Sequence, residues 1–297
     1  MRKFFVRNLP GYAFLTPWLL GFFLLALGPM LISLYLSFTK WDMVGDPQWV
    51  GLAQYEYMFL KDKRFWQSLD VTFTYVILAV PARLAFALMI AIVLDKGIRK
   101  IGIYRALYYL PSILGASIAI AILWREIFNI DGVVNAVLIN FGIQGPNWIG
   151  NPDTSLYTLV VLAMWQFGSP MLIFLAGLRN IPTELYEAAE IDAASKAKQF
   201  FSITLPLLAP VLFFNIILQT IEAFKTFSSA FIISNGDGSP ADSLLFFTIY
   251  LFNEAFTYFR MGYASALAWT LLIIIGLFTA VSFYTSKYWV YYENERD

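Results

Sequence analysis

The chain has 297 residues, of which 59% are hydrophobic and only 13% charged, and its formal net charge is zero. A soluble domain carries about twice this share of charge, so the composition indicates a protein that lies in lipid, and the balanced charge argues against a nucleic-acid surface. Because the chain has neither cysteine nor histidine, disulfides, zinc thiolates and histidine-based catalytic sites are excluded. Glycine motifs that bind nucleotides are also missing from the sequence, so we expect no cofactor and no enzymatic activity.

Apolar runs long enough to cross a bilayer follow one another along the chain. The first has a basic lead like that of a signal peptide, but it is too long for one and no small-residue cleavage site follows, so we expect a retained span. The fifth is overlong, which suggests a tilt or an interfacial first turn near Pro206 and Pro210. We therefore expect one all-α integral membrane domain over residues 1–297. Its six expected spans cover about 12–38, 70–95, 104–127, 155–178, 203–234 and 263–287.

Lysine and arginine are distributed unevenly between the connections on the two sides of the membrane. The positive-inside rule makes the richer side cytoplasmic, which places both termini and the connection 179–202 in the cytoplasm. The richer side holds Arg2, Lys3, Arg7, Lys96, Arg99, Lys100, Arg105, Arg179, Lys196, Lys198, Lys287 and Arg296. The other side holds Lys40, Lys61, Lys63, Arg64, Arg125 and Arg260.

A charged, alanine-rich segment, residues 179–202, separates the fourth and fifth expected spans. Pro182 suits the first helical position, Glu184 complements the positive end of the helix dipole, and Ser195 could cap a second short helix. The residue pattern alone leaves two interpretations open, a compact docking knob and an amphipathic connector that anchors at the interface. Small side chains on one face of the first helix would let another surface approach closely. This face consists of Leu185, Ala188, Ala189 and Asp192.

This segment resembles the EAA loop of permease subunits from binding-protein-dependent ABC importers. The family pattern is Glu-Ala-Ala, three residues, Gly and, further on, Ile-x-Leu-Pro. Here the corresponding residues are Glu187-Ala188-Ala189, then Ala193 in place of the glycine, and Ile203-Thr204-Leu205-Pro206. The flanks "LTPWLLGFFLLALGPMLISLYLSFTKWD" and "FRMGYASALAWTLL" look like the maltose-type sugar permeases, so that the match extends over nearly the whole chain.

The resemblance implies a type I ABC importer permease fold in a bacterial cytoplasmic membrane. It also implies a carbohydrate substrate, a second homologous permease subunit, two copies of a cytoplasmic ATPase and an extracellular or periplasmic solute-binding protein. In the family the loop docks in a cleft of the ATPase, where Glu187 would meet a basic residue. Since alanine lacks glycine's freedom for positive φ, we expect Ala193 to change the geometry of the turn without abolishing docking.

A stripe of polar residues follows the fifth expected span at intervals of four, three, four and three, which is one face of a helix. Hydrogen-bonding groups that face lipid are costly, so the stripe should face protein or water. Contact between helices is one interpretation. We favour the other, that the stripe lines a substrate path, and the resemblance supports it. The stripe consists of Asn215, Gln219, Glu222, Thr226 and Ser229.

Three charged residues, Arg83, Glu222 and Lys225, fall at membrane depth. Each needs a partner or a water-filled cavity, because a lone charge in hydrocarbon is costly. We favour an internal pair, Arg83 or Lys225 with Glu222, that holds helices in register. The alternatives are a site for an acidic or richly hydroxylated saccharide and, for Lys225, snorkelling to the interface.

Two further groups are candidates for the substrate path. Gln166 and Ser169 flank Gly168 in the fourth expected span, where Gly168 and Pro170 would permit a kink and expose backbone carbonyls. Trp269, which shares a face of the sixth expected span with Ser265, could stack on a sugar ring.

Other classes of membrane protein fit less well. A secondary transporter would usually carry internal repeats and more spans. A membrane enzyme would need a catalytic cluster, whereas the aspartates in "NIDG" and "NGDGSP" resemble turn residues. An ABC permease for a solute other than a sugar, such as glycerol phosphate, stays open as an alternative.

Overall fold

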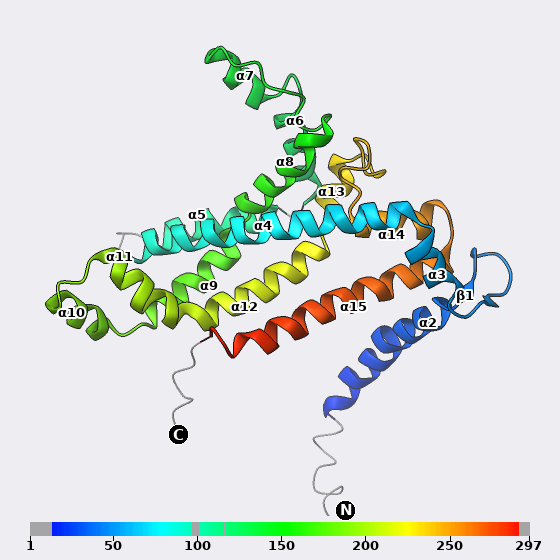
Figure 1. Cartoon of the computed structure of the whole chain (residues 1–297), viewed down its shortest axis with the longest axis horizontal. Helices are drawn as coiled ribbons and strands as arrows, with labels where there is room; N and C mark the ends of the chain where they lie inside the picture. Colours follow the sequence, from blue (N-terminus) through cyan, green and yellow to red (C-terminus); the bar gives the residue numbers. More distant parts are fainter. Residues whose placement is uncertain (1–13, 97–100, 116, 291–297) are drawn as a thin grey trace, which may run out of the picture. The chain divides into compact units, whose positions relative to one another are not determined.

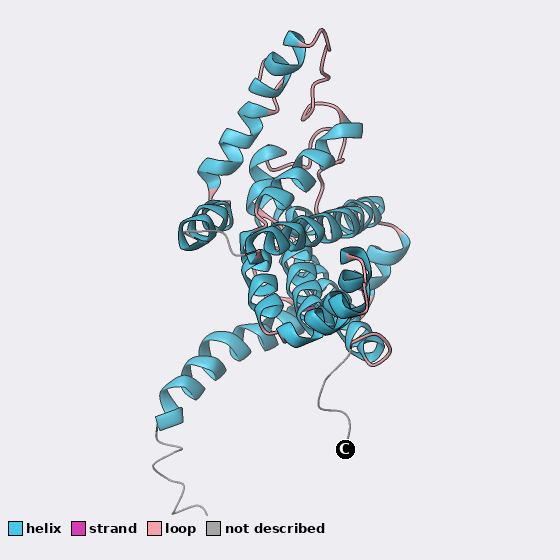
Figure 2. Cartoon of the chain, turned by 90° about the vertical axis from the view of Figure 1, so that its left-hand side faces the viewer, coloured by secondary structure: helices cyan, strands magenta, loops and turns pink. Residues whose placement is uncertain are grey.

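The computed structural model describes residues 14–96, 101–115 and 117–290, and most of them lie in helices (Figures 1 and 2). The helices, with π-helices marked η, are η1 (Phe22–Leu27), α2 (Gly28–Leu36), α3 (Ala53–Leu60), α4 (Lys63–Asp95), α5 (Ile101–Leu114), α6 (Ile118–Ile127), α7 (Val133–Asn140), α8 (Pro152–Trp165), α9 (Gly168–Arg179), α10 (Thr183–Ile191), α11 (Lys196–Gln199), η2 (Phe200–Thr204), α12 (Leu205–Phe224), α13 (Ser228–Ile233), α14 (Phe247–Phe252), η3 (Asn253–Thr257) and α15 (Met261–Ser286). The strands β1 (Thr39–Lys40) and β2 (Gln48–Trp49) form an antiparallel ribbon in which Thr39 pairs with Trp49.

Several helical stretches are long and apolar enough to cross a bilayer. Among the described residues there are four such stretches, Phe14–Leu36, Lys63–Asp95, Lys196–Ile233 and Met261–Ser286. The bent pairs α5–α6 and α8–α9 raise the number to six if each pair is one span. The all-α membrane architecture expected from the apolar runs is therefore confirmed. The assignment of both termini to the cytoplasm falls on ends of the chain that lie outside the described residues.

The third expected span, 104–127, differs from a single helix. α5 ends at Leu114 and α6 begins at Ile118. Ser117 has extended backbone dihedrals and its Oγ accepts a hydrogen bond from the backbone N–H of Ile120 at 3.3 Å. Such a cap starts a new helix instead of continuing the old one, which is why the apolar run did not reveal the break.

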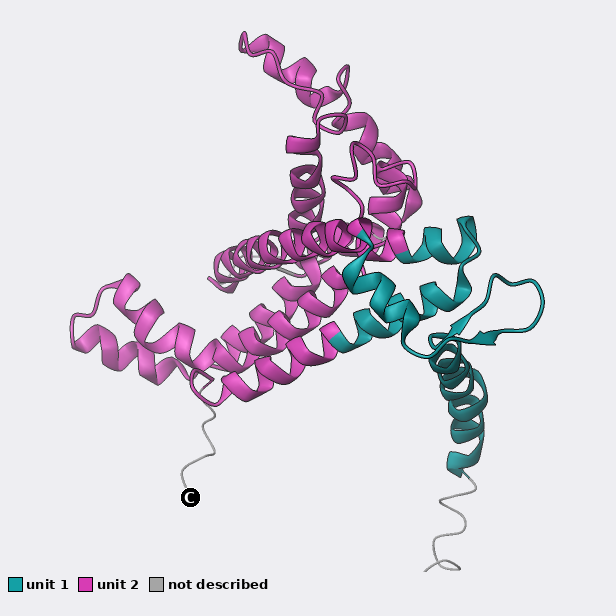
Figure 3. Cartoon of the chain, turned by 45° about the vertical axis from the view of Figure 1, so that its right-hand side comes forward, with its two compact units in different colours: residues 1–62, 251–273 teal, residues 63–250, 274–297 magenta. Residues whose placement is uncertain are grey.

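The chain divides into two compact units, one formed by residues 1–62 and 251–273 and the other by residues 63–250 and 274–297 (Figure 3). In the described part of the first unit, the β1–β2 ribbon contacts the start of α15. A Cβ on Gly262 would lie only 2.1 Å from the carbonyl oxygen of Thr39. Only glycine permits this approach, and the Gly262 N–H donates to the Trp41 carbonyl oxygen at 3.2 Å. Buried Glu254 forms an ion pair with Arg260 at 2.6 Å in the same unit.

In the second unit, α4 packs against α8, α9 and α12, and α5 packs against α9 (Figure 1). The 33 residues of α4 give a helix about 50 Å long, which exceeds the hydrocarbon thickness of a bilayer. One face of it is buried by aliphatic and small residues at helical spacing, which bring the neighbouring helices close. This face includes Val76, Ala79, Val80, Leu84, Ala87, Ala91 and Leu94.

Candidate functional site

A cavity of about 240 Å³ lies among α4, α8 and the C-terminal end of α12. Most of the path residues predicted from the sequence line it, although they come from different helices. Those at the cavity wall are Arg83, Gln166, Gln219, Glu222, Lys225, Thr226 and Ser229. The structure thus brings together polar groups that the sequence placed on separate expected spans.

Three of the predicted path residues are not in this wall. Asn215 is fully buried, and its Nδ2 donates to the Val211 carbonyl oxygen one turn earlier in α12. Ser169 is half-buried beside the wall, and its N–H donates to Ser112 Oγ at 3.1 Å. Trp269 is half-buried on α15 in the other compact unit.

The fourth expected span bends where Gly168 and Pro170 predicted a kink. α8 ends at Trp165, α9 begins at Gly168, and the angle between them is 44°. A Cβ on Gly168 would lie 2.5 Å from the Tyr108 carbonyl oxygen, so glycine is needed for α5 to pass this closely. The kink is confirmed.

The backbone carbonyl freed at this bend is held by side chains. Arg83 donates to the Gln166 carbonyl oxygen through both Nε and Nη2, at 3.0 and 2.6 Å. Ser112 Oγ donates to the same oxygen at 2.8 Å. We expected carbonyls here to be available to sugar hydroxyls. For Gln166 this is wrong, because a cation satisfies the exposed carbonyl and fixes the bend.

The polar stripe does not lie on one continuous helix as predicted. α12 ends at Phe224, Lys225 to Phe227 form an irregular turn, and α13 begins at Ser228. Thr248 Oγ1 holds this turn by donating to the Thr226 carbonyl oxygen at 2.5 Å. The stripe spacing fails at the turn, yet Thr226 and Ser229 still reach the cavity because the chain bends around it.

The membrane-depth charges pair as expected in part. Lys225 Nζ lies 2.8 Å from Glu222 Oε1, whereas Arg83 binds a backbone carbonyl instead. Lys225 and Glu222 are three residues apart at one helix end and are both more than half exposed. The pair therefore does not hold two helices in register, and it leaves both charged groups at the cavity wall.

Gln219 is the buried polar residue at this wall whose acceptor is unused. Its side chain is only 7% exposed, and its Oε1 accepts no hydrogen bond from any residue that the structure describes. A buried acceptor without a partner is costly in a folded protein. Gln219 also lines the cavity, so a rotation of its amide group would let a ligand hydroxyl or a water there satisfy this oxygen.

The connection 179–202 forms the expected helix–turn–helix, α10 followed by α11 (Figure 1). Pro182 lies just before the first helical residue rather than in it, and Glu184 is in the first turn. Ser195 caps α11 as predicted, with its Oγ accepting from the Lys198 N–H at 3.3 Å. Glu187 and Ala188 are exposed and Ala189 is half-buried, so the helix presents part of the predicted face to the outside.

Ala193 adopts a φ of +54°. The Ala193 N–H donates to the Glu190 carbonyl oxygen at 3.0 Å, and the Ala194 N–H donates to that of Ala189 at 2.9 Å. These two bonds form a Schellman turn, which usually has glycine at the left-handed position. The expected change in turn geometry is therefore wrong: alanine keeps the left-handed turn and bears its strain.

Two features of this connection were missed in the sequence. Ile191, at the end of α10, is 87% exposed and was left out of the predicted face. Its helical position next to that face was the signal that could have included it. Glu190 forms an ion pair with Lys196 Nζ at 2.6 Å, which joins α10 to α11. The hydrogen bond from Lys196 and its charge lower the pKa of the Glu190 carboxyl.

Residues 51–288 match the family described as the inner membrane component of binding-protein-dependent transport systems. The chain belongs to this family. Its members are transport permeases, which confirms the resemblance carried by the EAA loop.

Similar proteins agree with this assignment. The probable ABC transporter permease protein YesP of Bacillus subtilis (strain 168) is 53% identical, with 98% of this chain and 94% of that protein covered. The arabinooligosaccharides transport system permease protein AraP of the same organism is 32% identical, with 94% and 89% covered. In the crystal structure of a bacterial alginate ABC transporter in complex with alginate pentasaccharide-bound periplasmic protein, one chain aligns with a TM-score of 0.82 at 18% identity, over 97% of each chain. The chain thus has the fold of an ABC importer permease.

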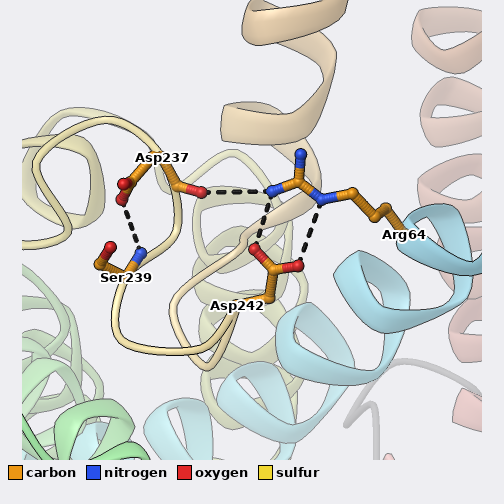
Figure 4. Close-up of polar contacts among 4 residues, drawn as sticks. All are labelled: Arg64, Asp237, Ser239 and Asp242. Carbon is orange, nitrogen blue, oxygen red and sulfur yellow. Dashed lines mark hydrogen bonds and ion pairs between the residues drawn. The ribbon is translucent and has the colours of Figure 1, made fainter.

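The loop between α13 and α14 is held to the start of α4 by an arginine fork (Figure 4). Arg64 donates to both carboxylate oxygens of Asp242, at 3.2 Å from Nε and 2.7 Å from Nη2. Within the loop, the Ser239 N–H donates to Asp237 Oδ1 at 2.8 Å, and this bond with Ser239 lowers the pKa of the Asp237 carboxyl. Asp237 is therefore a turn residue, as its "NGDGSP" context predicted, while the fork to Arg64 had no local signal.

Proposed function

We propose that the chain is a membrane subunit of an ABC importer for an oligosaccharide, and that the cavity among α4, α8 and α12 is its part of the translocation path. The observation that carries this proposal is that polar side chains from separate helices line one cavity, among them Gln219, whose buried Oε1 accepts no hydrogen bond from the described residues. Glu222, Lys225 and Thr226 add further donors and acceptors to the lining of the same cavity, and sugar hydroxyls can both donate and accept hydrogen bonds. The sugar named for AraP supports the substrate class.

The proposed complex contains a second homologous permease subunit, two copies of a cytoplasmic ATPase and a solute-binding protein outside the membrane. The family description supports the binding protein. In the proposed complex the energy comes from the ATPase, since this chain has no nucleotide-binding motif. We assign the connection 179–202 to ATPase docking, with Glu187, Ala188, Ala189, Asp192 and Ala193 as the motif residues. Both termini would then lie in the cytoplasm, as the distribution of lysine and arginine predicts.

Single cysteines test the path, because the native chain contains none. In the complex reconstituted with its co-encoded subunits, Gln219→Cys and Thr226→Cys should react with a water-soluble thiol reagent at rates that change with nucleotide. Leu218→Cys is the matched control, since Leu218 is adjacent in α12, lies outside the cavity wall and is 37% exposed. Equal rates at Leu218 and Gln219, with no response to nucleotide, would place the path elsewhere.

The substrate class needs a separate measurement. The solute-binding protein encoded beside this chain should bind neutral or uronate-containing oligosaccharides in a ligand screen. Binding of a phosphorylated solute such as glycerol phosphate, with no saccharide bound, would refute the carbohydrate assignment but leave the path intact.

A further inference from the structure

A second polar cavity, of about 400 Å³, lies at the opposite end of α13 from the first. Ser228 and Ser229, where α13 begins, line the first cavity, and Ile233, where it ends, lines the second. The six residues of α13 rise about 9 Å along the helix axis. The two cavities are therefore neighbours along one short helix.

Two asparagines in the wall of the second cavity have their amide oxygens held by backbone groups. Asn129 Oδ1 accepts from the Ile130 N–H at 2.8 Å. In the loop before α8, Asn147 Oδ1 accepts from the Gly150 N–H at 2.8 Å. Neither amide NH₂ group donates to a protein atom among the residues that the structure describes. Each side chain is thus oriented by its oxygen and offers its donors to the cavity.

A carboxylate and a third amide complete this wall. Arg125 Nη1 donates to Asn235 Oδ1 at 3.0 Å, which fixes that amide in the same way. Glu126 is 60% exposed and lies 3.8 Å from Arg125 Nε. The cavity lining therefore combines amide donors and a carboxylate acceptor with the apolar side chains of Ile149 and Ile233.

We propose that this cavity is an outer saccharide subsite, in which Asn129 and Asn147 donate to sugar oxygens and Glu126 accepts from sugar hydroxyls. Saccharides match this wall because each hydroxyl is both donor and acceptor and each ring has C–H groups for an apolar contact. The assignment rests on the proposed transport of oligosaccharides. A chain of several sugar rings would contact both cavities along α13, whereas a shorter sugar would occupy one at a time.

Asn147→Asp removes the donors but keeps the oxygen that accepts from the Gly150 N–H, so the loop should fold as before. The matched control is Asn151→Asp, which makes the same exchange in the same loop. Asn151 Oδ1 caps α8 by accepting from the Asp153 N–H at 3.0 Å, and Asn151 is not part of the cavity wall. Asn129→Asp is a second test variant on α6's side of the cavity.

The assay is uptake of arabinan-derived and alginate-derived oligosaccharides, from disaccharide to hexasaccharide, into vesicles that contain the complete complex and its binding protein. Loss of one hydrogen bond should raise KM about five-fold for Asn147→Asp and Asn129→Asp, with the largest effect on the longest sugars. Asn151→Asp should match the wild type.

Three results would overturn the subsite. Equal KM for Asn147→Asp and Asn151→Asp at every sugar length would show that the cavity does not bind substrate. If Asn147→Asp reduces the stimulation of ATPase activity by the binding protein equally with and without sugar, the wall contacts the binding protein instead of the sugar. If the binding protein binds no saccharide in the ligand screen, the proposed function fails and the subsite fails with it.

Discussion

The left-handed turn at Ala193 predicts that Ala193→Gly will stabilise the connection between α10 and α11. An L-residue in this conformation costs about 1–2 kcal/mol, because its Cβ crowds the following carbonyl. Glycine avoids that cost but loses about 0.4–1 kcal/mol through its greater freedom in the unfolded chain. The net gain should be about 0.5–1 kcal/mol, which lowers local opening about two- to five-fold.

Hydrogen exchange at the amides of Ala193 and Ala194 measures this opening directly, since both N–H groups donate within the turn. In the subunit purified in lipid nanodiscs, a peptide that covers the turn should exchange about two- to five-fold more slowly in Ala193→Gly.

Ala194→Gly is the matched control, because Ala194 lies outside the left-handed region. Glycine there relieves no strain and only adds unfolded-state freedom, so exchange should become faster. If Ala193→Gly exchanges as fast as the wild type, or both variants exchange faster, Ala193 bears no conformational strain in the turn.

Three shorter predictions follow from the same structure. Glu187→Ala, at an exposed helical position, should change stability by less than about 0.5 kcal/mol but reduce sugar-stimulated ATPase activity of the complex; unchanged coupling would remove Glu187 from docking. The lowered pKa of Glu190 means that its pair with Lys196 adds stability above the ordinary glutamate pKa and loses it as pH falls through the lowered value. The protection factor of the turn, which corrects the exchange rate for its intrinsic dependence on pH, should therefore fall at acid pH, and Glu190→Gln, which lacks the charge, should show no such transition. Arg64→Lys cannot form the fork to Asp242. Hydrogen exchange in loop 234–243 should therefore rise, but by less than about five-fold, as for a partly exposed ion pair. Lys61→Arg is the control for replacing one cationic side chain by another, and equal effects of the two variants on the loop would contradict the fork.

The apolar runs predicted the helical membrane fold well, because length and hydrophobicity are local properties of the sequence. The two short helices of the connection 179–202 could also be predicted, since Ser195 caps the second of them through a neighbour in the chain. The breaks were harder to predict. At the first break Ser117 caps α6, but in the sequence it looks like any other serine in an apolar run. The turn at Lys225 is held by Thr248, a residue distant in the sequence.

The partner of Arg83 could not be read from the sequence either. Arg83 was expected to seek a carboxylate, yet it binds a backbone carbonyl that exists only because α8 and α9 bend. Charge pairing is the usual rule for side chains at this depth. A break in a helix frees a backbone carbonyl that competes with carboxylates for such a cation, and the periodicity of the sequence does not reveal the break.

The breaks themselves identify the cavity more sharply than the polar stripe does. Gly115 lies at the end of α5, Gln166 between α8 and α9, and Lys225 at the end of α12, and all three line the same cavity. Irregular backbone at membrane depth is tolerated only where protein or water satisfies its polar groups. Three breaks from separate parts of the sequence would each be costly if scattered over a lipid-facing surface. Their convergence on one cavity, which Gln219 also lines, therefore supports the proposed path.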